Sequence, residues 1–227
     1  MDLVLITSAI EEELIELETF NHQELKLDKN IYKIILLPLG IGKLNALYNL
    51  MNWYYNHLRN DSLKEIIFLG SCGSYDLDYK KDFIASCDFI NYDYASLTST
   101  SKTLLEVSKR IKTEQGEVAK SIIHLYQWEF GIVNSTDSIT LKKIDKNILL
   151  KKINNLSTSN VYENLETYGI ALFCSKIKIP FTAFLSITNA VYENGSEEWL
   201  KNYRTMAKKM NLMIKNYLKG ILDSSFF

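Results

Sequence analysis

Short apolar runs alternate along the chain with segments in which apolar residues recur every three or four positions. The runs whose length predicts buried strands cover residues 3–7, 31–37, 65–69, 83–86, 130–133 and 181–187. The segments with helical character cover residues 11–20, 43–57, 101–112 and 166–176, and a final helix that we expect Ser196 to cap. This alternation predicts an α/β fold, one domain over residues 1–227 with a central, mostly parallel mixed sheet flanked by helices.

The helix expected at residues 43–57 has an apolar face. Leu44, Leu47, Met51 and Tyr54 fall on it. The segment at 142–160 is rich in Asn and Lys, and we interpret it as a solvated helix and loop.

Composition excludes several classes of protein. The net charge of −1 gives no reason to expect nucleic acid as a partner, and no apolar run reaches the ~18 residues of a membrane span. The chain starts without a basic segment, so we expect no signal peptide. Cys72, Cys87 and Cys174 are far apart, which favours reduced thiols in a cytoplasmic protein. We therefore expect no metal and no cofactor.

Three short segments follow strands and carry polar or small residues, at 8–13, 69–74 and 185–189. The exits of parallel strands meet at one sheet edge, where α/β proteins bind ligands. Each segment also has a plain structural interpretation. Glutamates suit a first helical turn, Gly and Ser form ordinary turns, and Asn189 is a common turn residue.

Six motifs in order make the chain resemble the methylthioadenosine/S-adenosylhomocysteine nucleosidases, within the nucleoside phosphorylase superfamily. The motifs are Ser8-Ala9-Ile10-Glu11-Glu12-Glu13, Leu39-Gly40-Ile41-Gly42-Lys43, Gly70-Ser71-Cys72-Gly73, a distorted match at 133–139, Asn164-Leu165-Glu166 and Thr188-Asn189. The resemblance implies a nucleoside phosphorylase-like fold, a purine nucleoside as substrate and a homodimer. The aromatic-rich Trp53-Tyr54-Tyr55 adds mild support for the dimer.

The resemblance also implies a role for each matched residue. Glu13 falls on the carboxylate that activates water, and Glu166 on the one that binds the ribose hydroxyls, with Leu165 packed on the sugar. Asn189 falls on the acid that protonates purine N7, with Thr188 before it. Four further matches surround the nucleoside: Ile41, Ser71, Cys72 and Gly73. Two others, Ser138 and Ile139, fall near the purine base.

Asn189 raises a chemical question, because the family has an aspartic acid there. An amide donates an N–H but delivers no proton, and general acid catalysis is typically worth roughly 100- to 10,000-fold. A 6-oxopurine presents two acceptors, N7 and O6, that the two amide protons could serve, although a flipped amide could pair with adenine. The trimeric purine nucleoside phosphorylases, which cleave inosine and guanosine, carry a motif similar to Ile187-Thr188-Asn189.

Other departures from the family keep three functions open. Leu185 stands in place of an arginine, the loop after Asp93 is shortened, and residues 8–18 hold no Arg or Lys to bind phosphate. The three functions are a purine nucleosidase with altered base or 5′ specificity, a purine nucleoside phosphorylase, and a nucleoside-binding paralogue with little turnover.

Overall fold

The computed structural model of the chain describes residues 1–27, 29–58, 61–101, 110–154 and 160–224. Its strands are β1 Asp2–Ser8, β2 Glu24–Leu27, β3 Asn30–Pro38, β4 Ser62–Ser74, β5 Phe83–Ile90, β6 Arg110–Lys112, β7 Glu129–Asn134, β8 Val161–Glu163 and β9 Phe181–Ala190. The α-helices are α1 Lys43–His57, α2 Tyr94–Leu97, α3 Glu117–Tyr126, α4 Lys146–Lys152, α5 Thr167–Ile177 and α6 Gly195–Ser224. Two 3₁₀ helices, η1 Glu11–Glu13 and η2 Ile15–Phe20, follow β1.

All nine strands of the described residues belong to one mixed sheet, which is the kind of sheet that the sequence predicts. β1 lies parallel between β3 and β4, and β4 continues parallel to β9. β9 also pairs antiparallel with β5, and β5 leads through β7 and β8 back to the end of β4. The strands β4, β9, β5, β7 and β8 therefore form a closed circuit, and the exits of β1, β4 and β9 share one edge.

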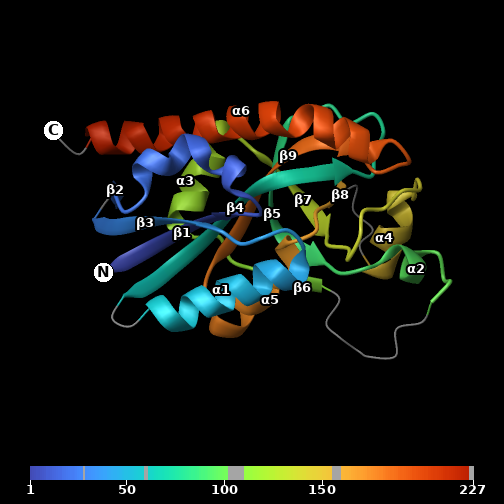
Figure 1. The fold of residues 1–227 in the computed structure, drawn as a ribbon, viewed down its shortest axis with the longest axis horizontal. Coiled ribbons are helices and arrows are strands. Elements are labelled where there is room, and N and C mark those ends of the chain that lie inside the picture. Colours follow the sequence, from blue (N-terminus) through green and yellow to red (C-terminus); the bar gives the residue numbers. More distant parts are fainter. Residues whose placement is uncertain (28, 59–60, 102–109, 155–159, 225–227) are drawn as a thin grey trace.

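Helices cover both faces of the sheet (Figure 1). α6 and α3 lie on one face with η1 and η2, and α1 and α5 lie on the other. An apolar core lies on each face of the sheet, and both cores include residues of β1 and β4. Side chains alternate between the two faces along a strand, and every residue of β1 from Leu3 to Ser8 is buried, so this strand contributes to both cores. A third apolar cluster joins α2 and α4 to β5, β7 and β8.

The segment at 11–20 is not the α-helix that its acidic start predicts. It forms the tight turns η1 and η2, in which the Glu13 amide donates to the Ile10 carbonyl at 3.2 Å and the Leu14 amide to the Glu11 carbonyl at 2.9 Å. These turns bring Glu13 and Leu14 inward while Glu11 and Glu12 stay exposed. The burial of Glu13 and Leu14, rather than the helix propensity of the segment, therefore determines its backbone geometry.

Two other helix predictions need correction. Arg110–Lys112 is a strand that pairs antiparallel with β5, held by the Arg110 guanidinium, which donates to Asp88 Oδ2 at 2.6 Å. The rest of that prediction, 102–109, lies outside the described residues. Ser196 does not cap the final helix, because α6 already begins at Gly195.

Only half of the apolar face predicted for α1 packs inward: Leu47 and Tyr54 pack against the core, but Leu44 and Met51 do not. Leu44 is 75% exposed and Met51 37%, whereas Ala46 and Leu50 are fully buried. α1 packs on α5, and a Cβ on Gly169 of α5 would lie 2.6 Å from the Lys43 carbonyl oxygen, so the two helices approach closely there. Leu44 and Met51 are left on the outer side of the helix.

Candidate functional site

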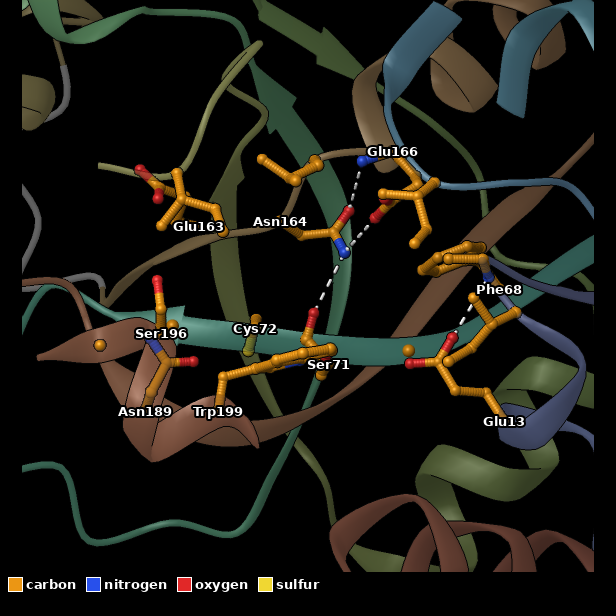
Figure 2. Close-up of a pocket in the computed structure, with 18 residues that line it drawn as sticks. Glu13, Phe68, Ser71, Cys72, Glu163, Asn164, Glu166, Asn189, Ser196 and Trp199 are labelled. Carbon is orange, nitrogen blue, oxygen red and sulfur yellow. Dashed lines mark hydrogen bonds between the residues drawn. The ribbon is translucent and has the colours of Figure 1, made fainter. Parts of the chain in front are cut away.

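A cavity of about 240 Å³ lies where β1, β4, β8 and β9 end. Figure 2 shows its walls, with Asn164 and Glu166 across from Trp199, and with Glu13 and Asn189 at opposite ends. The residues that line it come from six parts of the chain: Ala9, Ile10, Glu13, Ile41, Phe68, Gly70, Ser71, Cys72, Gly73, Ile139, Glu163, Asn164, Leu165, Glu166, Asn189, Gly195, Ser196 and Trp199.

Most residues that the sequence singles out lie in this cavity. Its lining includes Glu13, Ile41, Ser71, Cys72, Gly73, Ile139, Leu165, Glu166 and Asn189. Thr188 lies directly behind the wall, fully buried, with its hydroxyl 3.3 Å from the Cys72 carbonyl oxygen. Ser138 is exposed and its neighbour Ile139 lines the cavity instead.

Glu13 reaches the cavity from η1 and is only 4% exposed. The Ala9 amide donates to its Oε2 at 3.2 Å. Burial raises the pKa of Glu13 to about 8, and the nearby Glu166 carboxylate adds to the rise. A carboxyl group with its pKa near neutrality is suited to accept a proton from water, because it exchanges protons readily at the working pH.

Glu166 stands at the start of α5, where two groups hold its carboxylate. The Gly42 amide donates to Oε1 at 2.8 Å, and the Asn164 side-chain amide donates to Oε2 at 2.8 Å. Gly40 and Gly42 have φ values of 88° and 89°, a backbone that L side chains rarely adopt, and this turn aims the Gly42 amide at Glu166. Burial raises the pKa of Glu166 while these hydrogen bonds oppose the rise.

The Asn189 side chain is fixed in one orientation. Its Oδ1 accepts the Thr188 hydroxyl at 2.9 Å, and its Nδ2 donates to the Ala190 carbonyl at 2.8 Å. A carbonyl only accepts, so Nδ2 must face it, and a flipped amide would lose that bond. One amide proton is already used, which leaves a single N–H to donate into the cavity rather than the two that the sequence suggests.

Two glycines make room for this amide. A Cβ on Gly73 would lie 2.8 Å from Asn189 Nδ2, and one on Gly195 would lie 3.2 Å from it. Neither φ is in the left-handed region that favours glycine, so the requirement is space. Gly73 of β4 and Gly195 at the start of α6 therefore leave the space that the Asn189 carboxamide occupies in the cavity wall.

Trp199 is a site residue that the sequence does not single out for chemistry. Its indole comes from the first turns of α6, and its Nε1 donates to the Ser71 hydroxyl at 3.0 Å. The ring stacks on Tyr203, with centroids 4.5 Å apart and planes at 11°. Figure 2 places Trp199 across the cavity from Asn164. An aromatic wall is thus present, although it comes from α6 and not from residues 138–139.

A second unexpected residue, Glu163, is buried at the base of the cavity wall. Its carboxylate accepts from the Tyr75 hydroxyl at 2.8 Å, the Thr140 amide at 3.0 Å and the Thr140 hydroxyl at 2.6 Å. Burial raises its pKa. These bonds tie the segment that carries Ile139 to β8, so Glu163 holds part of the cavity wall in place.

No cluster of three or more His, Cys, Asp or Glu side chains suited to a metal occurs in the part of the chain that the structure describes. Within that part there is also no helix long and apolar enough to cross a membrane.

Leu185, where the resemblance has an arginine, is fully buried in β9. The cavity thus offers a carboxyl group at one end, an amide N–H at the other and a second carboxylate between them.

Comparison with known proteins gives a family and a fold. A model described as the phosphorylase superfamily matches residues 6–219. The 5'-methylthioadenosine/S-adenosylhomocysteine nucleosidase of Buchnera aphidicola is 27% identical in a match that covers 95% of this chain and 96% of that protein.

Two solved structures from Helicobacter pylori have the same fold. The 5'-methylthioadenosine/S-adenosylhomocysteine nucleosidase with butyl-thio-DADMe-Immucillin-A aligns with a TM-score of 0.72 at 21% identity, over 99% of each chain. A futalosine hydrolase mutant aligns with a TM-score of 0.72 at 20% identity, over 99% of this chain and 100% of that one.

Proposed function

Because this chain belongs to the phosphorylase superfamily, we propose that it hydrolyses the N-glycosidic bond of purine nucleosides in the cavity described above. One observation carries the proposal: Glu13, Glu166 and Asn189, far apart in sequence, line a single cavity. The named relatives, nucleosidases and a futalosine hydrolase, support hydrolysis over phosphorolysis and over binding without turnover. We also propose that residues 1–227 form one domain, since the nine strands found in the described part of the chain join one sheet.

The proposed reaction divides between the two ends of the cavity. Cleavage of the bond places positive charge on the sugar and negative charge on the leaving purine. Glu13 takes a proton from the attacking water, and Glu166 accepts hydrogen bonds from the ribose hydroxyls. Its carboxylate is already oriented by Gly42 and Asn164, so little reorganisation is needed when the sugar binds.

At the other end, Asn189 donates its remaining N–H to purine N7. Because the amide delivers no proton, the base must leave as an anion, and hypoxanthine or guanine is a better leaving anion than adenine. We therefore propose 6-oxopurine nucleosides as the preferred substrates. The fixed orientation of Asn189 supports this choice, since a flipped amide that pairs with adenine would break its bond to Ala190.

The remaining cavity residues contact the nucleoside in this proposal. Ile41, Leu165 and Ile139 supply apolar walls, and Ser71, Cys72 and Gly73 line the floor formed by β4. Thr188 acts behind the wall by orienting Asn189. Ser138 is exposed and has no part in this arrangement.

We propose that a second copy of the chain packs on the outer face of α1. Four apolar side chains spaced like one helical stripe are exposed there, Leu44 at 75%, Tyr48 at 69%, Met51 at 37% and Tyr55 at 67%. Ile41, next to this stripe, lines the cavity and is 56% exposed. A homodimer would bury the stripe.

We also propose a cytoplasmic location, in keeping with three free thiols.

The dimer is tested by sedimentation of Leu44→Glu and Tyr48→Glu. Both variants should sediment as monomers at concentrations at which the wild type is a dimer. Leu200→Glu, at a position 67% exposed on α6, is the control and should not change the sedimentation.

The reaction is tested by product analysis with inosine in buffers with and without phosphate. Hydrolysis predicts hypoxanthine and free ribose at equal rates in both buffers. Formation of ribose 1-phosphate that depends on phosphate would instead identify a phosphorylase. Tight binding of inosine without release of hypoxanthine would identify a binding protein.

A further inference from the structure

A second cavity, of about 210 Å³, lies behind Glu13 between η1, η2 and α6. We call it the rear cavity, and its lining includes Glu13, Tyr203, Arg204, Ala207, Lys208 and Asn211. Glu13 lines both this cavity and the one proposed to hold the nucleoside. The two cavities also share an aromatic partition, because Tyr203 faces the rear cavity and stacks on Trp199 of the front one.

Asn211 gives the rear cavity an unsatisfied acceptor. Its side chain is 1% exposed, and its Nδ2 donates to the Glu13 main-chain carbonyl at 2.9 Å. Its Oδ1 is buried and has no hydrogen-bond partner among the described residues. A buried amide oxygen without a partner destabilises the folded state. Water bound in a cavity of this size removes that cost, because one water needs only about 10–15 Å³ and polar partners.

The rear cavity is also lined by charged side chains at the surface. Arg204 and Lys208 of α6 lie along it and are exposed, as is Glu12, and Glu16 of η2 is half-buried. On the front side, Glu166 faces Glu13 and raises its pKa. The rear cavity therefore extends from Glu13, one of its lining residues, to side chains at the surface.

We propose that the rear cavity is a water compartment that removes the proton from Glu13 after each cleavage. This inference rests on the proposed function. In that reaction the water oxygen bonds to C1′ of the sugar, one water proton passes to the Glu13 carboxylate, and the C1′–N9 electron pair leaves with the purine. The purine anion takes a proton from solvent. Glu13 then loses its proton through the rear water to bulk, and the balance is nucleoside plus water to ribose plus purine.

The test fills the rear cavity without touching the front one. Ala207 is 6% exposed and lines only the rear cavity, so Ala207→Leu displaces its water. Thr205→Leu adds an apolar side chain at an exposed position of the same helix and is the matched control. We expect kcat for inosine to fall at least tenfold in Ala207→Leu, with the affinity for hypoxanthine unchanged, and neither quantity to change in Thr205→Leu.

A second readout does not depend on turnover. In protein labelled with ¹³C-glutamate, NMR titration follows Glu13, and its signal is assigned by its loss in Glu13→Gln. Removal of water from a carboxylate favours its neutral form. We therefore expect the titration midpoint of Glu13 to rise by at least one pH unit in Ala207→Leu and to stay constant in Thr205→Leu.

The outcomes separate the two proposals. A wild type that releases no purine refutes the proposed function, while the titration still judges the rear cavity. An unchanged midpoint in folded Ala207→Leu refutes the water compartment. If Ala207→Leu does not fold, Asn211→Leu is titrated in its place and carries the same expectation and the same refutation.

Discussion

Asn164 holds Glu166 from two directions. Its Nδ2 donates to the Glu166 carboxylate at 2.8 Å, and its Oδ1 accepts the Glu166 main-chain N–H at 2.9 Å. The same Oδ1 also accepts the Thr167 amide at 2.9 Å, which satisfies a free N–H at the start of α5. One side chain therefore both ends the loop after β8 and orients the carboxylate proposed to bind ribose.

This relationship predicts different effects for two substitutions. Asn164→Asp keeps the acceptor for the α5 amides but places a buried carboxylate against Glu166 and the Ser71 carbonyl, so at neutral pH the affinity for inosine should fall about tenfold or more and stability should fall too, with less loss of stability at pH 4, where the new carboxyl group is protonated. Asn164→Ala also removes the cap and should lower the free energy of unfolding by about 0.5–2 kcal/mol. Steady-state kinetics and urea unfolding of both variants measure the two effects. A stability loss at pH 4 that is as large in Asn164→Asp as in Asn164→Ala would contradict the capping role.

Asn189→Asp should change which bases are released. The carboxyl group supplies the proton that adenine needs as a leaving group, so release of adenine from adenosine should rise roughly 100- to 10,000-fold, the usual range for general acid catalysis. Parallel assays with adenosine and inosine measure the change. The control is Asn202→Asp on α6, which makes the same substitution at the asparagine whose side-chain amide donates to the Thr188 carbonyl, and it should bring no such gain with adenosine. No gain with adenosine would refute the account of Asn189.

Stability should fall as pH rises through the range set by Glu13. Its pKa is about 8 in the folded protein against an ordinary value of 4.5, so between these values the folded state holds a proton that the unfolded state releases. The stabilisation is complete below pH 4.5 and is lost as pH rises to about 8. Each tenfold difference in ionisation constant corresponds to about 1.4 kcal/mol.

Glu13→Gln should therefore flatten the decline in unfolding free energy between pH 5 and pH 8. Part of the slope should remain, because burial also raises the pKa of Glu65 to about 7. Urea unfolding at several pH values measures the slope, and Glu12→Gln, at an exposed position, should leave it unchanged. A Glu13→Gln slope equal to that of the wild type would show that Glu13 ionises normally.

The fluorescence of Trp199 should change when a ligand binds, and its ring should contribute to the affinity for the ligand. Trp199→Leu removes the aromatic wall and should raise KM for inosine roughly tenfold, in line with the 1–3 kcal/mol of a base stacked on an aromatic ring. Trp199→Phe keeps a ring and should raise it less. Hypoxanthine should change tryptophan fluorescence in Trp53→Phe, the control on α1, but not in Trp199→Phe. Fluorescence changes of equal size in both would place the base elsewhere.

Much of the fold could be predicted because it depends on local pattern. The long strands β1, β3 and β9 and the helices α1 and α5 follow from apolar runs and helical spacing. β2 and β8 could not, since strands of four and three residues are too short to display a period. α3 has a clear apolar face, with Val118, Ala119 and Ile122 buried, and that signal was available in the sequence.

The site was partly predictable for a different reason. Motif order identified the segments that carry Glu13, Glu166 and Asn189, but it said nothing of side-chain contacts. The use of one Asn189 proton by Ala190 depends on the backbone after β9, which no motif encodes. The helical spacing of Trp199 and Tyr203 is that of a buried face, and it indicates packing in the core rather than a place in the site.

The most direct test of the proposed reaction is the initial rate of hypoxanthine release from inosine, in buffer without phosphate, for the wild type and Glu13→Gln. We predict steady release by the wild type and a rate at least 100-fold lower for the folded variant, because Gln accepts no proton from water. Equal rates in the two proteins would contradict the assignment of Glu13 as the group that activates water.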